Sequence, residues 1–233
     1  VVEAMESAVM GAERAAPASH EGPSGLVRVG ATEGFGTLIL APHLAQLTRK
    51  HPHLSIDLLA LPRMLHLSRR EADIVISLER PTRGSVIVSR LSDYSLYLYG
   101  QREYLARKPL VATREDLRHH AFVSYVDDLL FTKELQFLDA LHQPERFAFR
   151  STSITAQYEA VRAGAGLAVL PAFLADRDPV LTRVLPQEGQ FTRTFWMSMP
   201  SESKHLARMQ VTWAFLRETV AAQQELLKPK AVR

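Results

Sequence analysis

The 233-residue chain contains no cysteine. This absence excludes disulfide bonds, thiolate metal sites and cysteine nucleophiles, and it is typical of a reducing compartment. Long apolar runs are also missing, because no stretch reaches the roughly 18 consecutive apolar residues of a membrane-spanning helix. The N-terminus lacks the basic segment followed by an apolar segment that marks a secretory signal. We therefore expect a cytoplasmic protein without membrane contacts.

An excess of charge of one sign is missing too. The 28 Lys and Arg residues are nearly balanced by 25 Asp and Glu residues, which leaves a net charge of +3. Both signs are spread along the whole chain, whereas a dedicated nucleic-acid binder concentrates its basic residues in a patch or stripe. Hydrophobic residues make up 46% of the chain, which is ordinary for a globular protein and sufficient for a core.

Motifs for catalysis, metals and nucleotides are absent. His51 and His53 flank a proline and His119 and His120 are adjacent, so neither pair places two imidazoles on one helical face. The sequence has no Gly-x-Ser-x-Gly elbow, no Gly-x-Gly-x-x-Gly motif and no Walker lysine. Asp73 could be a catalytic acid, but its position at a strand start favours a turn-stabilising role. We expect no catalytic residues, no metal and no cofactor.

The order of secondary-structure signals predicts an α/β fold. Residues 1–16 favour a helix, and Pro and Gly residues then indicate a linker. From residue 25, short apolar strands alternate with helical patterns, which predicts parallel strands with crossover helices. Pro42 predicts a kink or a late helix start. The expected strands lie at residues 26–29, 54–58, 73–77, 96–98, 122–125, 147–150, 167–170 and 195–199. The expected helices lie at residues 32–50, 63–70, 102–106, 113–117, 132–141 and 154–163, with a long one after residue 203.

Three segments together resemble the effector-binding domain of LysR-type transcriptional regulators. They are residues 25–31 (GLVRVGA), 67–74 (LSRREADI) and 160–171 (AVRAGAGLAVLP). The His51-Pro52 pair, the Arg80-Pro81 pair and the segment around Trp196 with its following amphipathic helix match as well. The resemblance covers about residues 25–218, and the order and spacing of the motifs make it specific.

The resemblance implies two Rossmann-like lobes joined by two crossover strands, as in type II periplasmic binding proteins. Lobe I would comprise residues 25–91 and 195–227, and lobe II residues 92–194. Residues 1–24 would be the end of a linker helix plus a flexible linker, and residues 228–233 a tail. The family also implies a homodimer or homotetramer, with candidate interfaces on the helices after His43 and Thr132. Promoter DNA would be bound only through a winged helix-turn-helix that this chain does not contain.

A candidate ligand site follows from two helix starts that face one cleft in this arrangement. Thr32 ends the first strand, and Ser153, after Thr152, ends the strand at 147–150. Free backbone N–H groups at helix starts favour anions by about 0.3–1 kcal/mol, so a small carboxylate effector is expected. Thr32 and Ser153 could instead be plain helix caps. Glu33 would repel a carboxylate unless it points away or pairs with an arginine, so a cationic or hydroxyl-bearing ligand is the alternative.

Other predicted ligand-binding residues follow the remaining strands. Arg80 could pair with a ligand carboxylate or lie in solvent, and Tyr125 could face the ligand or pack in the core. The predicted set comprises Thr32, Glu33, Phe35, Ser77, Glu79, Arg80, Tyr125, Val126, Thr152 and Ser153.

Two other functions are alternatives to a regulator. A solute-binding protein of a transport system would share the two-lobed architecture. It would not begin with a helix end and a linker rich in Pro, Ser and Gly. An enzyme on a similar fold would need a nucleophile–base pair or a metal cluster, and neither is visible.

Overall fold

The computed structural model describes residues 22–63, 67 and 71–229. In the first lobe, strand β1 (Gly25–Thr32) lies between β2 (Leu54–Leu61) and β3 (Ile74–Ser77) and is parallel to both. Its side chains alternate, so that Val27, Val29 and Ala31 are buried. The chain returns from β1 to β2 through α2 (Glu33–Phe35), a π-helical segment (Gly36–Leu40) and α3 (Ala41–Lys50). Pro42 lies in the first turn of α3, where its missing N–H costs little.

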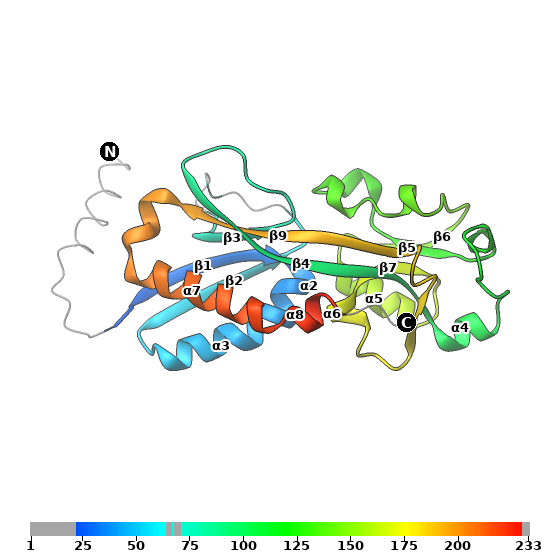
Figure 1. Ribbon diagram of the computed structural model, residues 1–233, viewed down its shortest axis with the longest axis horizontal. Helices are drawn as coiled ribbons and strands as arrows, with labels where there is room; N and C mark the ends of the chain where they lie inside the picture. Colours follow the sequence, from blue (N-terminus) through cyan, green and yellow to red (C-terminus); the bar gives the residue numbers. More distant parts are fainter. Residues whose placement is uncertain (1–21, 64–66, 68–70, 230–233) are drawn as a thin grey trace.

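Two long antiparallel strands connect the lobes. β4 (Val86–Gln101) and β9 (Gln190–Pro200) pair along their length, with a register shift between Arg90 and Ser92. β9 also pairs with β3 of the first lobe, whereas β4 pairs with β7 (Ala168–Pro171) and β8 (Leu181–Val184) of the second. Within the described ranges this gives one curled seven-stranded sheet in the order β2-β1-β3-β9-β4-β7, with β8 beside β4. The elongated shape follows these two strands (Figure 1).

The second lobe surrounds the far ends of the long strands. It contains the parallel pair β5 (Phe122–Ser124) and β6 (Phe147–Arg150), and a bridge from Phe122 to Leu167 connects this pair to the end of β7. Its helices are α4 (Arg102–Ala106), α5 (Ile154–Arg162) and α6 (Ala172–Ala175). Gly164, just after α5, has a φ of 79°, the left-handed conformation that glycine adopts readily at a helix end.

The C-terminal helices pack along both lobes. α7 (Ala207–Ala222) covers the first lobe and buries Met209, Leu216 and Val220. α8 (Gln224–Leu227) lies against β4 near the crossing, where Gln224 Nε2 donates to Ser92 Oγ at 2.9 Å (Figure 1). None of the helices within the described ranges combines the length and the apolarity needed to cross a membrane.

The two-lobed α/β fold with crossover strands is confirmed, and several details differ from the prediction. The helix predicted at 113–117 is a 3-10 segment, Glu115–His119, and the strand predicted at 96–98 is part of the longer β4. Residues 132–141 form two 3-10 turns, Lys133–Leu135 and Leu138–Ala140, instead of a helix. Their apolar side chains are buried at helix-like spacing, which explains the wrong prediction. β8 was not predicted at all. The predicted helix at 1–16 lies outside the described residues, as does most of the one at 63–70.

Candidate functional site

A cavity lies between the start of α2 in the first lobe and the start of α5 in the second. It comprises about 450 Å³ of space, part of which is open to solvent. Both lobes and both crossing strands contribute to its walls, which is the usual position of a ligand site in a two-lobed fold. The lining residues are Thr32, Glu33, Gly34, Phe35, Pro62, Leu78, Tyr94, Leu96, Tyr125, Phe131, Leu135, Thr152, Ile154, Pro171, Phe173 and Phe195.

A stack of aromatic rings forms part of the cavity wall. The ring of Phe195 on β9 stacks between Phe35 and Tyr94, with centroid distances of 4.1 Å and 4.3 Å. Phe173 of the second lobe packs at an angle against both Phe35 and Tyr94. Rings from the first lobe, the crossing strands and the second lobe are therefore in direct contact, so a change in the lobe arrangement would disturb the stack.

Glu33 joins the two lobes at the cavity edge. Its Oε1 accepts a hydrogen bond from Ser153 Oγ at 2.8 Å, and its Oε2 accepts one from the backbone N–H of Ile154 at 3.0 Å. Ser153 is the N-cap of α5, and its Oγ also accepts from the Ala156 N–H at 3.0 Å. The sequence predicted that the start of α5 binds an anionic ligand. In the structure this helix start binds the carboxylate of Glu33.

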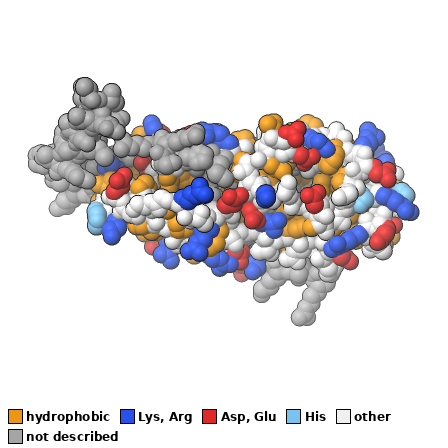
Figure 2. Space-filling model, turned by 90° about the horizontal axis from the view of Figure 1, so that it is seen from above, with side chains coloured by type: hydrophobic (Ala, Val, Ile, Leu, Met, Phe, Trp, Pro, Cys, Tyr) orange, Lys and Arg blue, Asp and Glu red, His pale blue; other side chains and the backbone are white. Residues whose placement is uncertain are grey.

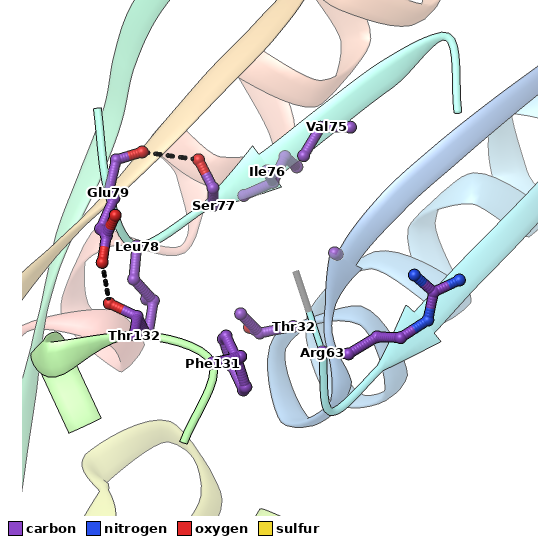
Figure 3. Close-up of a pocket in the computed structure, with 10 residues that line it drawn as sticks. Thr32, Arg63, Val75, Ile76, Ser77, Leu78, Glu79, Phe131 and Thr132 are labelled. Atoms are coloured by element: carbon purple, nitrogen blue, oxygen red, sulfur yellow. Dashed lines mark hydrogen bonds between the residues drawn. The ribbon is translucent and has the colours of Figure 1, made fainter. Parts of the chain in front are cut away.

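A smaller cavity adjoins the first and shares Thr32, Leu78 and Phe131 with it. It comprises about 350 Å³ of space, part of which is likewise open to solvent. Here Thr132 of the second lobe donates its hydroxyl hydrogen bond to the carboxylate of Glu79 in the first lobe (Figure 3). Thr132 is itself an N-cap that accepts the Glu134 N–H at 3.1 Å. The Glu33 arrangement is therefore repeated, with a first-lobe carboxylate bound to a capping hydroxyl of the second lobe.

Most of the predicted ligand-binding residues lie at these cavities. Thr32, Glu33, Phe35, Tyr125 and Thr152 line the larger one, and Ser77 and Glu79 line the smaller one. Ser153 contacts the site through Glu33.

Arg80 and Val126 line neither cavity. The guanidinium carbon of Arg80 lies 5.4 Å from the centre of the Trp196 ring, as in a cation–π contact. Val126 precedes the 3-10 turn Asp127–Leu129.

Sequence reasoning found Tyr125 and Thr152 of the second lobe but missed the residues that the crossing strands contribute and several others of the second lobe. Tyr94 and Phe195 stand at the crossing, where the strands leave one core for the other and the alternation of apolar residues is lost. The only sequence feature that pointed to them was an aromatic residue beside each predicted lobe boundary, at residues 91/92 and 194/195. Phe131 and Phe173 lie in irregular or short segments that gave no periodic pattern.

The larger cavity contains little charge. No Lys, Arg or His is among its lining residues in the described part of the chain, and Glu33 is its one acidic residue. Burial raises the pKa of Tyr94 and of Tyr125 well above the ordinary tyrosine value, so both hydroxyls stay protonated. Neither hydroxyl has a hydrogen-bond partner among the described residues. The same residues contain no cluster of His, Asp or Glu suited to a metal ion.

Comparison with known proteins gives consistent matches. Residues 20–221 match the LysR substrate binding domain. An HTH-type transcriptional regulator from Haemophilus influenzae is 24% identical over 164 residues, which are 67% of this chain and 56% of that protein. The HTH-type transcriptional regulator CrgA from Neisseria meningitidis is 24% identical over 207 residues, which are 86% of this chain and 69% of that protein.

A solved structure supports the fold independently. The regulatory domain of CrgA, a LysR-type transcriptional regulator from Neisseria meningitidis, superposes with a TM-score of 0.74 at 23% identity. The match covers 85% of this chain and all of that domain. The chain spans 56% of the Haemophilus influenzae regulator and 69% of CrgA, and so matches only part of each.

Proposed function

Because the chain belongs to the family of LysR substrate binding domains, we propose that it senses a small-molecule effector for a LysR-type transcription regulator. The observation that carries this proposal is the cavity between α2 and α5, which is walled by both lobes and by both crossing strands. We assign residues 25–91 and 195–227 to lobe I and residues 92–194 to lobe II. The effector site comprises the lining residues of the larger cavity, with Ser77 and Glu79 beside it.

The regulatory mechanism is a shift between lobe arrangements. The Glu33–Ser153 and Glu79–Thr132 hydrogen bonds stabilise the arrangement described above. The register shift between β4 and β9 lies beside Asp93, which binds both Arg90 and Thr194, so this crossing is a natural hinge. An effector shifts the balance only by the difference in its affinity for the two arrangements.

The whole regulator would transmit this change to promoter DNA through a helix-turn-helix module and a homodimer or homotetramer in the cytoplasm. On the face shown in Figure 2, Lys and Arg side chains are interspersed with Asp and Glu rather than gathered into a stripe. This surface gives no support to direct DNA binding by the domain. The family match supports a regulator over a solute-binding protein or an enzyme, since the similar proteins named above are transcriptional regulators.

A thermal-stability screen with small metabolites tests this function. Compounds that bind the cavity raise the melting temperature, because they bind only the folded state. Thr152→Trp fills the cavity and is expected to abolish this effect, whereas Leu110→Trp is a matched control at a residue that is 83% exposed. Compounds that stabilise the Thr152→Trp variant as well as the parent chain would contradict binding in the cavity.

A further inference from the structure

The walls of the larger cavity are mainly apolar. Six of its lining residues are aromatic, and six more are Leu, Ile or Pro. The remaining polar groups are the Thr32 and Thr152 hydroxyls, the Tyr94 and Tyr125 hydroxyls, and the Glu33 carboxylate. An ion that enters such a site loses its hydration and must find a partner of opposite charge to compensate.

Among the residues that the structure describes, the larger cavity offers a carboxylate no such partner. Arg63 lines only the adjoining smaller cavity, and its guanidinium forms an ion pair with Glu71 at 3.3 Å. Two helix starts supply electropositive N–H groups at this cavity. At the start of α5, Glu33 already accepts the hydrogen bonds of Ser153 Oγ and the Ile154 N–H, and Glu33 itself stands in the first turn of α2, where it would repel a second anion. A ligand carboxylate would be repelled by Glu33 and would have to displace it.

Close packing on both sides holds Glu33 in place. A methyl group on Gly34 would lie 2.9 Å from Ile154 Cγ2, so α2 and α5 approach as closely as a glycine permits. The next residue, Phe35, is buried in the aromatic stack with Phe195. Because both neighbours are fixed, the Glu33 side chain starts from a fixed backbone position, and its displacement would break two hydrogen bonds.

The hydroxyls of Tyr94 and Tyr125 show which uncharged group the cavity can bind. Tyr94 is only 3% exposed, and its hydroxyl has no partner among the described residues. Tyr125 lines the same cavity as Tyr94 and Glu33. Two protonated hydroxyls and a carboxylate with unused lone pairs suit a ligand hydroxyl, which can accept one hydrogen bond and donate another.

From this we infer that the effector of this cavity is an uncharged, mainly apolar molecule that carries a hydroxyl, and that Glu33 is the residue that rejects anionic effectors. Glu33 takes the place that a ligand carboxylate would occupy at the start of α5. The inference rests on the proposed function and specifies the ligand class of the same cavity.

Matched triplets of ring compounds test this inference. Each triplet carries one ring with a hydroxymethyl, a carboxylate or an aminomethyl group, for example benzyl alcohol, benzoate and benzylamine. Ligand-observed NMR titration of the chain gives the dissociation constant of each compound, and Thr152→Trp identifies the part of the signal that comes from the cavity. We expect the alcohols to bind at least about tenfold more tightly than the carboxylates. The amines are expected to bind more weakly than the alcohols, because the ammonium group loses its hydration in an apolar cavity and the Glu33 carboxylate is already engaged by Ser153 Oγ and the Ile154 N–H.

Glu33→Gln gives the matched variant, because it removes the charge and keeps the size of the side chain. We expect carboxylates to gain affinity in this variant and the alcohols to lose some, because the hydroxyl loses a charged acceptor, so the preference for alcohols over carboxylates should fall. Carboxylates that bind the parent chain as well as the alcohols do, with no gain in Glu33→Gln, would overturn the inference and leave the proposed function standing. Amines that bind the parent chain more tightly than the alcohols would also overturn it. If no compound binds in a Thr152-sensitive manner, both the inference and the proposed function fail.

Discussion

Replacing Glu33 with Ala removes the carboxylate that joins the two lobes at the start of α5. The parent side chain accepts hydrogen bonds from Ser153 Oγ at 2.8 Å and from the Ile154 N–H at 3.0 Å. A hydrogen bond to a charged group contributes about 1.5–3 kcal/mol when its partner is left unsatisfied. Two facts reduce this sum: Ser153 keeps its bond to the Ala156 N–H, and the site is only partly buried.

We therefore expect Glu33→Ala to lower the free energy of unfolding by about 1–3 kcal/mol. Urea unfolding followed by Trp196 and Trp213 fluorescence measures this change. Glu202→Ala is the matched control, because Glu202 also lies in the first turn of a helix but is exposed. This control should change stability by less than about 0.5 kcal/mol.

A double-mutant cycle with Ser153→Ala separates the contact from other effects of the substitution. If the carboxylate and the hydroxyl stabilise each other, the two losses are not additive, and we expect a coupling free energy of about 1 kcal/mol. A Glu33→Ala variant as stable as the Glu202→Ala control, together with zero coupling to Ser153, would refute the view that Glu33 joins the lobes.

Three further outcomes follow from the structure. Gly34→Ala places a methyl group 2.9 Å from Ile154 Cγ2, so it should lower the free energy of unfolding although alanine favours helices. Adding Ile154→Ala should restore part of this loss. A Gly34→Ala variant as stable as the parent chain would be contrary evidence. Burial lowers the pKa of His120 below 6.5, so the unfolded chain binds more protons. The free energy of unfolding should therefore fall as the pH is lowered below 6.5, and His120→Gln should flatten the dependence of the urea midpoint on pH. An unchanged pH dependence in this variant would exclude His120 as the cause. Gly166→Ala places its Cβ 2.3 Å from the Ala121 carbonyl oxygen at a φ of 157° and should cost more than about 2 kcal/mol in urea unfolding; a neutral effect would contradict this geometry.

Local sequence signals were sufficient for elements such as β1 of the first lobe and α5 of the second, because these elements follow simple patterns. The alternation of Val27 and Val29 predicted β1, and the cap and glycine signals around α5 predicted that helix. The length of β4 was not predictable, because polar residues such as Arg90 and Asp93 stand where the strand passes between two cores. An alternation rule recognises a strand only where one of its faces is buried along its length.

Some residues of the candidate site were likewise predictable from the sequence, and others were not. The positions of Thr32 and Thr152 at the cavity follow from their place after a strand, which the sequence reveals. The role of Glu33 does not, because its partner Ser153 is 120 residues away along the chain and the contact depends on how the lobes are oriented. The aromatic stack likewise combines residues from both lobes and both crossing strands, so no single segment carried its pattern.

The central claim is that an effector binds in the cavity between the starts of α2 and α5. Amide-resolved NMR of the chain, titrated with the compound that most raises its melting temperature, tests this claim most directly. We expect the largest shift changes at residues 32–35, at Tyr125 and at residues 152–154. Saturating changes confined to other surfaces, with these amides unaffected, would contradict the claim.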